Sequence, residues 1–316
     1  MLIKTKPIKN VILFLIVIIL LIFVIGCATG IADINTEENK IQFQKNLDLP
    51  EGSDGKIVYL EKIIIDNKYS VDCYKMKYLS DGLKVVGFLL KPKGENLKYP
   101  AMIYNRGGNR EYSKITKKYL KSLSYLSSNN YVVLASQYRG NDGGQGREEF
   151  GGKDVNDVLN LIIMAKSLSF VKQDKIVMLG FSRGGMMTYL AIKNGAKIKA
   201  AAVVGGLTDL IQWEQERKSI GEKVLEQLIF PHNKEEYKKR SAYYWPERIN
   251  IPILILHGED DWRVKVSQAK KLSKKLTELG KVHKLVIFPK GDHLLRSHRL
   301  QKNRLIFEWF DKYLKH

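Results

Sequence analysis

The sequence predicts an α/β domain whose mostly parallel sheet is covered by helices on both faces. Its 316 residues are 44% hydrophobic, which is enough to bury one large core. Short apolar runs typical of buried strands occupy residues 100–104, 131–136, 175–179, 200–204, 252–256 and 284–288. Longer amphipathic segments separate these runs, and such alternation of strands and helices produces a parallel sheet with helices on either side.

The amphipathic segments have the apolar spacing of helices. Val155 and Val158 lie on one face of the first helix, and Asp154 stands where it can cap that helix. The same spacing recurs in residues 269–279 and again in residues 306–314. We therefore expect a helix at each of these three places.

The segment before the first parallel strand predicts a different arrangement. Three β-rich runs cover residues 56–65, 69–78 and 83–91, and the dipeptide Asp81-Gly82 between the last two is a hairpin signal. We expect these runs to form antiparallel strands at the amino-terminal edge of the sheet.

The amino terminus has the pattern of an export signal. Lys4, Lys6 and Lys9 precede an unbroken apolar run over residues 11–25. That run is shorter than the about 20 residues of a comfortable membrane span. The tetrapeptide that ends it, Val24-Ile25-Gly26-Cys27, resembles the lipobox of bacterial lipoproteins. We therefore predict a cleaved signal over residues 1–26 and a lipid on Cys27.

An uncleaved signal anchor is the alternative, and Cys27 would then be incidental. Residues 27–55 are polar and rich in turn-forming residues, as expected of a tether that carries a catalytic domain of residues 56–316. Both versions predict a protein attached to the membrane of a bacterial cell envelope, on the outer face of the cytoplasmic membrane.

The charge of the chain does not by itself indicate a partner. A formal net charge of +20 would suit nucleic acid or acidic lipids. The lysines are scattered, however, and the sequence has no zinc-finger cysteine pairs and no aromatic RNA-binding signature. We expect solvated helix faces and no nucleic-acid partner. Apart from Cys27 the chain has one cysteine, Cys73, which we expect in the core without a disulfide partner.

One turn has the features of a nucleophile elbow. It follows the strand at residues 175–179, precedes a helical run, and reads Gly180-Phe181-Ser182-Arg183-Gly184-Gly185. A serine at a sharp strand-to-helix turn tolerates little side-chain bulk nearby, so glycines at the flanking positions are expected. The start of the helix also directs backbone N–H groups at the point where negative charge develops. This turn predicts Ser182 as a nucleophile and the chain as an α/β-hydrolase fold.

A serine hydroxyl needs a base, which in this fold follows later in the chain than the catalytic acid. The strand at residues 284–288 is followed by His293, which we expect to be the general base. The strand before it is followed by three consecutive carboxylates, Glu259, Asp260 and Asp261, and their spacing from the strand does not choose among them. His257, which precedes all three, is expected to have a structural role.

The oxyanion hole needs two donors placed in advance. One is the backbone N–H of Arg183, directly after the nucleophile. The second is expected from the loop after the strand at residues 100–104, where the pair Gly107-Gly108 lets the backbone approach a substrate carbonyl. A plain turn is the alternative for this loop.

An insertion at about residues 207–250 separates two strands and is rich in aromatic residues. A stretch this long in a compact domain is usually a lid or a pocket wall. We expect four side chains to line the substrate pocket: Arg106, Trp213, Phe230 and Tyr243. Plain core packing is the alternative for each aromatic.

From about residue 85 onwards the chain resembles the catalytic domain of the prolyl oligopeptidase family of serine peptidases. Besides the elbow, the resemblance rests on Tyr138-Arg139-Gly140-Asn141-Asp142-Gly143, on Phe150-Gly151-Gly152-Lys153-Asp154-Val155, and on His257-Gly-x-x-Asp261-x-x-Val264. It implies Asp261 as the catalytic acid and supports His293 as the base. Where the family often has Tyr or His at the oxyanion loop, this chain has Arg106, which implies that the second donor is the backbone of Gly107 or Gly108.

These features predict acyl transfer to water through a Ser182 acyl-enzyme, without a metal or cofactor. By resemblance the expected substrate is a peptide or aminoacyl bond. A carboxylesterase or deacetylase that acts on small acyl esters is the alternative, since single-domain relatives use the same site for esters and the fold does not fix the substrate. A non-catalytic binding protein of the cell envelope is a third possibility, against which the complete set of Ser182, Asp261 and His293 argues.

Overall fold

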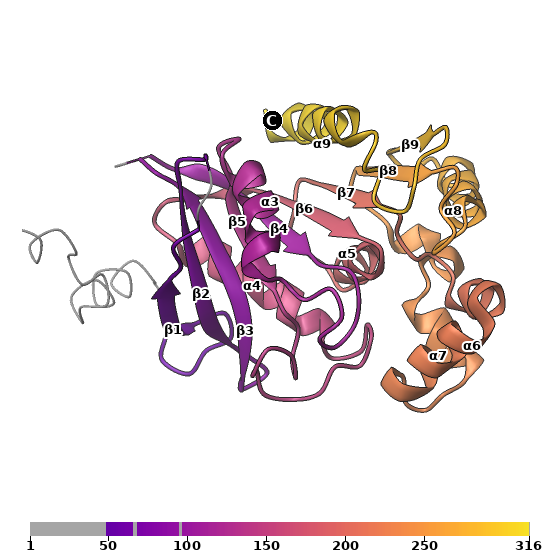
Figure 1. The fold of residues 1–316 in the computed structure, drawn as a ribbon, viewed down its shortest axis with the longest axis horizontal. Coiled ribbons are helices and arrows are strands. Elements are labelled where there is room, and N and C mark those ends of the chain that lie inside the picture. Colours follow the sequence, from indigo (N-terminus) through magenta and orange to yellow (C-terminus); the bar gives the residue numbers. More distant parts are fainter. Residues whose placement is uncertain (1–48, 66–67, 95–96, 316) are drawn as a thin grey trace, which may run out of the picture. The chain divides into compact units, whose positions relative to one another are not determined.

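A nine-stranded sheet runs through the described part of the chain in the order β1-β2-β3-β5-β4-β6-β7-β8-β9 (Figure 1). The computed structural model describes residues 49–65, 68–94 and 97–315. The predicted signal at residues 1–26, Cys27 and most of the predicted tether lie outside the described residues, so these expectations stay predictions. The strands are β1 (Ile57–Lys62), β2 (Val71–Ser80), β3 (Leu83–Pro92), β4 (Tyr99–Asn105), β5 (Val132–Ser136), β6 (Val171–Phe181), β7 (Ala200–Val204), β8 (Ile253–Gly258) and β9 (His283–Phe288).

The amino-terminal edge of the sheet is antiparallel, as the sequence predicts. β1 pairs with β2, β2 with β3, and β3 with β5, all antiparallel. Ser80 pairs with Leu83, so the loop between β2 and β3 has two residues, Asp81 and Gly82. Their φ angles of 51° and 73° are those of a type I′ turn, whose twist matches that of the strands. From β5 to β9 every pairing is parallel.

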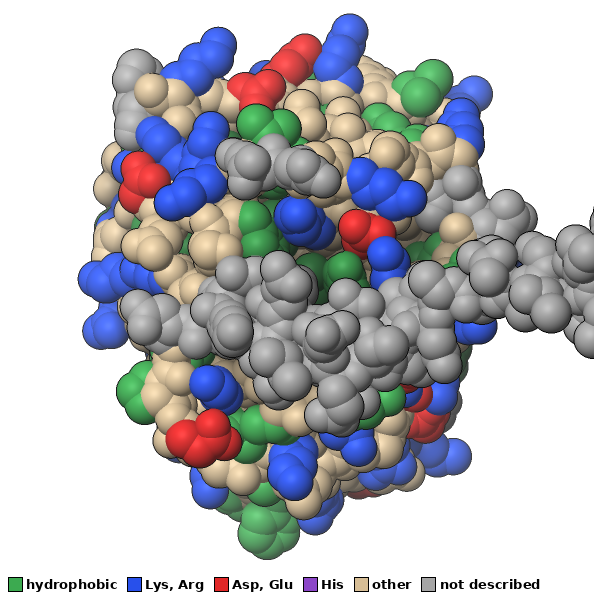
Figure 2. Space-filling model, turned by 90° about the vertical axis from the view of Figure 1, so that its left-hand side faces the viewer, with side chains coloured by type: hydrophobic (Ala, Val, Ile, Leu, Met, Phe, Trp, Pro, Cys, Tyr) green, Lys and Arg blue, Asp and Glu red, His purple; other side chains and the backbone are tan. Residues whose placement is uncertain are grey.

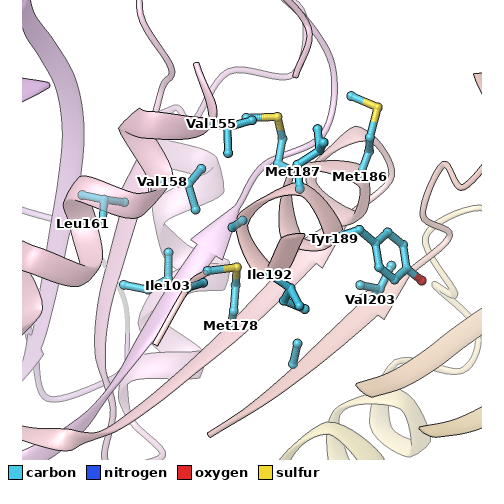
Figure 3. Packing of buried hydrophobic residues seen from close by; sticks show 14 of the residues in the cluster. Ile103, Val155, Val158, Leu161, Met178, Met186, Met187, Tyr189, Ile192 and Val203 are labelled. Carbon is cyan, nitrogen blue, oxygen red and sulfur yellow. The ribbon is translucent and has the colours of Figure 1, made fainter. Parts of the chain in front are cut away.

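Helices cover both faces of the sheet, which confirms the predicted fold class. Side chains of α4, α5, α6 and α8 pack with one set of strand residues, and side chains of α3 and α9 pack with the other set. Figure 3 shows α4 and α5 together on the first face, where Val158 and Ile192 approach Met178 of β6. The α-helices are α3 (Lys117–Ser127), α4 (Val155–Ser167), α5 (Arg183–Lys193), α6 (Leu210–Leu228), α7 (Lys234–Arg240), α8 (Val266–Glu278) and α9 (Arg299–Leu314).

Two local findings differ from the sequence-based expectations. Helix α3 was not assigned from the sequence, although its side chains Leu120 and Leu123 are buried. Asp154 occupies the N-cap position of α4 but makes no capping hydrogen bond with its side chain. Its carboxylate instead accepts the Gly151 N–H over 2.9 Å and pairs with Arg183 over 2.5 Å. The Asp154 carboxylate thus serves as counter-charge to a buried guanidinium, which would be costly to leave unpaired.

The insertion between β7 and β8 folds into α6, α7 and two short 3₁₀ helices, Ala242–Tyr244 and Pro246–Arg248. Figure 1 shows α6 and α7 side by side, far from the antiparallel edge of the sheet. Helix α6 is interrupted at Lys218, whose φ of 31° and ψ of −111° are not helical. The insertion therefore places a kinked helix against the carboxyl ends of the central strands.

The surface carries the excess positive charge in dispersed form. Figure 2 shows Lys and Arg side chains distributed over the face on the β1 side, interspersed with hydrophobic and neutral polar atoms. Within residues 49–65, 68–94 and 97–315, no helix has the length and apolar character to cross a membrane. Cys73 is buried in β2, as expected, with 3% of its surface exposed.

The buried ion pair between Arg139 and Asp157 joins the loop after β5 to α4, and its loss is expected to destabilise the fold. Arg139 Nη2 lies 2.7 Å from Asp157 Oδ1, and neither side chain is more than 3% exposed. The substitution Arg139→Met leaves a carboxylate buried without its partner, so we expect a loss of about 3 kcal/mol in the free energy of unfolding. Denaturant unfolding of the full chain measures it.

The same variant gives a pH dependence of known sign. Burial raises the pKa of Asp157 to about 6, and Arg139 acts in the opposite direction. Without Arg139 the pKa rises further, so the deficit in stability grows as pH increases and is smaller at pH 5 than at pH 8. The substitution Lys238→Met, which removes an exposed pair with Glu235, is the matched control and should cost less than about 1 kcal/mol. Equal losses in both variants would contradict the prediction.

Candidate active site

Ser182 stands at the turn between β6 and α5 in a strained backbone conformation. Its φ is 55° and its ψ is −123°, a combination that residues with a side chain rarely adopt. The Ser182 N–H donates to the Val204 carbonyl oxygen over 2.9 Å, and the Gly185 N–H donates to the Ser182 carbonyl oxygen over 2.8 Å. A serine held in this way between a strand and a helix has the geometry of a nucleophile elbow.

The glycines of this turn are required because neighbouring backbone passes too close for a side chain. A Cβ on Gly184 would overlap the carbonyl oxygen of Asn105, and a Cβ on Gly180 would overlap the carbonyl oxygen of Gly184. A Cβ on Gly185 would lie 2.5 Å from Val203 Cγ1. The absence of these side chains lets α5 start directly against the end of β4, which brings the loop after β4 beside the turn.

Asp261 and His293 form a buried pair at the carboxyl ends of β8 and β9. His293 Nδ1 lies 2.7 Å from Asp261 Oδ2, and the two residues are only 7% and 2% exposed. Because the carboxylate accepts the Nδ1 proton, Nε2 is the ring nitrogen left to exchange a proton with a neighbour. His293 and Ser182 line the same cavity.

The hydrogen bonds of Asp261 keep it ionised. Its Oδ1 accepts the N–H groups of Arg263 over 2.9 Å and of Val264 over 3.0 Å. Burial alone would raise the pKa of Asp261, but hydrogen bonds from the His257 and His293 side chains outweigh burial and hold this pKa well below its usual range. The neighbouring carboxylates, Glu259 and Asp260, are exposed.

His257 is a second histidine on the same carboxylate. It is fully buried, and its Nε2 lies 2.8 Å from the Val264 carbonyl oxygen and 3.1 Å from Asp261 Oδ2. A carbonyl oxygen can only accept, so Nε2 carries the proton. The structural role that the sequence predicts for His257 therefore consists of fixing the loop that carries Asp261.

The loop after β4 lies against the nucleophile. A Cβ on Gly107 would lie 3.2 Å from Ser182 Cβ and 3.8 Å from Ser182 Oγ, so a side chain there would be crowded against the nucleophile turn. On the other side of Ser182, Arg183 is the first residue of α5, and the N–H of a first helical residue has no acceptor within the helix. Gly107, Gly108 and Arg183 all line the cavity.

Two buried arginines hold the carbonyl groups of this loop. Arg106 Nη1 donates to the Gly107 carbonyl oxygen over 3.1 Å, and its Nη2 donates to the Arg110 carbonyl oxygen over 2.9 Å. Arg183 Nη1 donates to the Gly108 carbonyl oxygen over 3.1 Å. These hydrogen bonds satisfy carbonyl oxygens of the loop and fix its backbone beside Ser182.

Arg106 is therefore not a pocket residue, and that expectation was wrong. Its side chain is completely buried and also donates to the Gln137 carbonyl oxygen over 2.8 Å, because a chain this long reaches beneath the loop instead of over it. Arg183 is equally buried and pairs with Glu148 over 2.6 Å and with Asp154 over 2.5 Å. Burial lowers the pKa of Arg183, but the two carboxylates more than compensate, so the net shift is upward.

The cavity in front of Ser182 has a volume of about 450 Å³ and a largely apolar wall. Of the aromatics predicted to line it, Trp213 does so, whereas Phe230 is 88% exposed outside it and Tyr243 packs against Lys275 instead. Within the insertion, the wall comes from Leu207 and from side chains of α6 on both sides of its kink at Lys218. Lining residues that sequence reasoning missed are Phe150, Ile220, Val224 and Trp262.

The charged side chains in this cavity are all cationic. Among the described residues that line it, Arg217 and Arg263 carry charged side chains into it and no carboxylate is present, whereas the guanidinium of Arg183 is buried against Glu148 and Asp154. Arg217 and Arg263 both stack on the Trp262 ring, with 4.7 Å and 5.1 Å between guanidinium carbon and ring centroid. Across the described ranges, no cluster of three or more His, Cys, Asp or Glu side chains could hold a metal ion.

Several known peptidases are similar in sequence to this chain. The chain is 34% identical over 215 residues to the uncharacterized peptidase YtmA of Bacillus subtilis, a match that covers 67% of this chain and 82% of YtmA. It is 27% identical over 279 residues to dipeptidyl-peptidase 5 of Porphyromonas gingivalis, covering 80% of this chain and 40% of that protein.

A solved structure gives a similar result. The uncomplexed acylaminoacyl peptidase of Pyrococcus horikoshii has a TM-score of 0.67 and 25% identity, over 78% of this chain and 43% of its own. The chain thus spans less than half the length of these larger peptidases. Residues 118–316, which include the elbow, the acid and the histidine, match the prolyl oligopeptidase family. The chain belongs to the prolyl oligopeptidase family of serine peptidases.

Proposed function

We propose that this protein is a serine peptidase that forms an acyl-enzyme on Ser182, with His293 as general base and Asp261 as its partner. The observation that carries the proposal is the 2.7 Å contact between His293 Nδ1 and Asp261 Oδ2, made at the cavity that Ser182 also lines. Ser182, His293 and Asp261 follow three different strands, so their convergence has no simpler structural purpose.

The proposed reaction follows from these positions. His293 Nε2 takes the proton of Ser182 Oγ as this oxygen attacks the substrate carbonyl carbon, and the carbonyl oxygen becomes an oxyanion. His293 then gives the proton to the leaving nitrogen, the carbon–nitrogen bond breaks, and an ester to Ser182 remains. Water, deprotonated by His293, hydrolyses this ester and regenerates Ser182. Asp261 remains ionised and stabilises the charged imidazole throughout.

The oxyanion is proposed to bind the N–H groups of Arg183 and of Gly107 or Gly108. Donors of this kind act because they are fixed before charge develops, and removal of one typically costs a factor of about 10²–10³ in kcat. Here the fixing is done by the Arg106 and Arg183 side chains, which bind the loop's carbonyl oxygens.

The charge of the cavity favours a substrate without a free amino terminus near the scissile bond. An ammonium group needs an acidic partner when it is desolvated, and the described lining offers arginines only. A blocked amino terminus or an internal position of a peptide avoids this cost. By their names, a substrate of this kind fits an acylaminoacyl peptidase such as the Pyrococcus horikoshii relative better than a dipeptidyl-peptidase such as the Porphyromonas gingivalis relative.

We expect a fluorophosphonate probe to label the folded chain at Ser182. The Ser182→Ala variant should not be labelled. Ser113→Ala, which changes a serine of the same cavity, is the matched control and should still be labelled.

N-acetylated aminoacyl anilides should be hydrolysed faster than the same anilides with a free amino group, as measured by kcat/KM. Ester hydrolysis without any anilide hydrolysis over a broad side-chain panel would indicate a carboxylesterase, and a folded chain that resists labelling would indicate a binding protein.

Asp261→Asn should reduce kcat by about 10⁴, because an amide neither fixes the required His293 tautomer nor stabilises the imidazolium. The matched control is Asp260→Asn, one residue earlier and exposed, which should leave kcat unchanged. Steady-state kinetics on one anilide measure both variants. If Asp260→Asn were the more damaging change, the assignment of the acid would be wrong.

Arg183→Lys tests the support of the oxyanion loop. Lysine retains the backbone N–H and the positive charge but cannot bind Glu148, Asp154 and the Gly108 carbonyl oxygen together. We expect kcat to fall about 10-fold to 10²-fold with KM little changed, since the loss affects donors that act on the oxyanion. Arg110→Lys, an exposed change in the same loop, is the control. A variant whose thermal unfolding is normal and whose kcat is undiminished would contradict this role of Arg183.

A further inference from the structure

A second cavity of about 790 Å³ adjoins the catalytic cavity. The two share three wall residues, Tyr119, Phe181 and Leu294. Phe181 directly precedes Ser182, and Leu294 directly follows His293, so the second cavity opens beside both the nucleophile and the base. The reaction proposed above does not use it.

The second cavity lies over the opposite face of the sheet from the pocket wall made by α6. Its lining comes mainly from α3 and α9, whose side chains belong to one core layer, whereas α6 packs with the other layer. Tyr125 of α3, which lines this cavity, also contacts Phe307 of α9 edge to face, with 6.2 Å between ring centroids. Ser182 and His293 therefore stand between two binding spaces, one on either side of the scissile bond.

The lining of the second cavity combines aromatic rings with cations. Its rings include Tyr69, Tyr104 and Phe181. No carboxylate lines it among the described residues, whereas five cations do: Lys68, Lys121, Arg296, Arg299 and Lys302. Arg296 is paired with Asp292 over 3.2 Å, which still leaves an excess of positive charge in this concave, partly apolar space. Such an excess attracts anions.

Lys302 shows that this charge is built into the fold. It is only 8% exposed, its amine donates to the Leu294 carbonyl oxygen over 2.9 Å, and it lies 5.2 Å from the centroid of the Phe181 ring. Burial lowers the pKa of Lys302 to about 8. An anion bound beside it would restore the charge that burial disfavours.

The two cavities offer separate spaces for the two parts of a peptide substrate, the acyl portion and the leaving segment. The α6 side carries apolar walls suited to the acyl portion, and its cations stack on Trp262 at the entrance. His293 gives its proton to the leaving nitrogen, so the segment released first extends past His293 and Leu294. That direction leads to the second cavity.

We propose that the second cavity binds the leaving segment of the substrate through a carboxylate that this segment carries. This inference deepens the proposed function and rests on it. The carboxylate is either the carboxyl terminus of a short peptide or an acidic side chain just after the scissile bond. Arg299 and Lys121 are the exposed members of the cation set on α9 and α3, and they are the groups that such a carboxylate reaches first.

The test uses three N-acetylated peptides with one acyl portion and different leaving segments. The first ends in a free carboxylate, the second in a carboxamide, and the third in a carboxamide with a glutamate in the leaving segment. We expect kcat/KM of the full chain to be about 10-fold higher for at least one acidic peptide than for the neutral one. The peptide that gains shows whether the terminal or the side-chain carboxylate is recognised.

The double variant Lys121→Gln, Arg299→Gln should reduce this preference to less than about threefold, while leaving kcat/KM for the neutral peptide unchanged. Arg304→Gln, an exposed arginine on α9 outside the cavity, is the matched control and should retain the preference. Equal kcat/KM for all three peptides would overturn the proposal, as would a preference that the double variant retains.

The outcome stays separable from the proposed peptidase activity. Ester-linked versions of the same three substrates report the charge preference even if the amide bond is not cleaved. Protection of Ser182 against fluorophosphonate by each peptide reports it without any turnover. Loss of amide cleavage with a preserved preference would refute the peptidase function alone, and amide cleavage without a preference would refute the second cavity alone.

Discussion

The geometry of the site depends most on the burial of one guanidinium group, that of Arg183. The backbone of this residue begins α5 directly after Ser182, and its side chain reaches across to the Gly108 carbonyl oxygen on the other side of the cavity. A buried positive charge must be paired, and Glu148 and Asp154 provide that pairing. One side chain thereby links the nucleophile turn, the loop after β4 and the segment before α4, so none of the three can move independently.

A second buried guanidinium, that of Arg106, lies close to Arg183, and the repulsion between the two positive charges must be offset. Arg106 and Arg183 both face the Tyr138 ring, at 5.1 Å and 4.5 Å from its centroid. Burial and the charge of Arg183 lower the pKa of Arg106. Backbone carbonyl oxygens bound by its guanidinium offset this cost, and they include the Gly107 carbonyl. Holding the loop and neutralising Arg106 are thus achieved by the same hydrogen bonds.

Local patterns in the sequence predicted the strands and the elbow, because each depends on neighbours within a few residues. β7 matches its predicted bounds, and Ser182 stands where its glycines placed it. The pocket was predicted less well: of Arg106, Trp213, Phe230 and Tyr243, only Trp213 lines the cavity. Which side chain faces a cavity depends on how α6 and the buried Arg106 side chain lie in three dimensions, and residue spacing does not show this. The cations of the second cavity come from the segment before β2, from α3, and from α9 with the loop before it, which are far apart in the chain. In the sequence, each of these lysines and arginines looks like any other surface charge.

The positive charge of the second cavity affects how the proposed leaving segment is held before and after cleavage. Before cleavage, the nitrogen that will leave is an uncharged amide and is compatible with nearby cations. After cleavage it becomes an ammonium group, which in the proposed binding mode lies near Lys302 and Arg299 of α9, while the carboxylate of the same segment stays attracted to them. Like charges close together in a partly desolvated space repel strongly. If the second cavity binds the leaving segment as proposed, its cations bind that segment less well as product, which favours its release before water attacks the proposed acyl-enzyme.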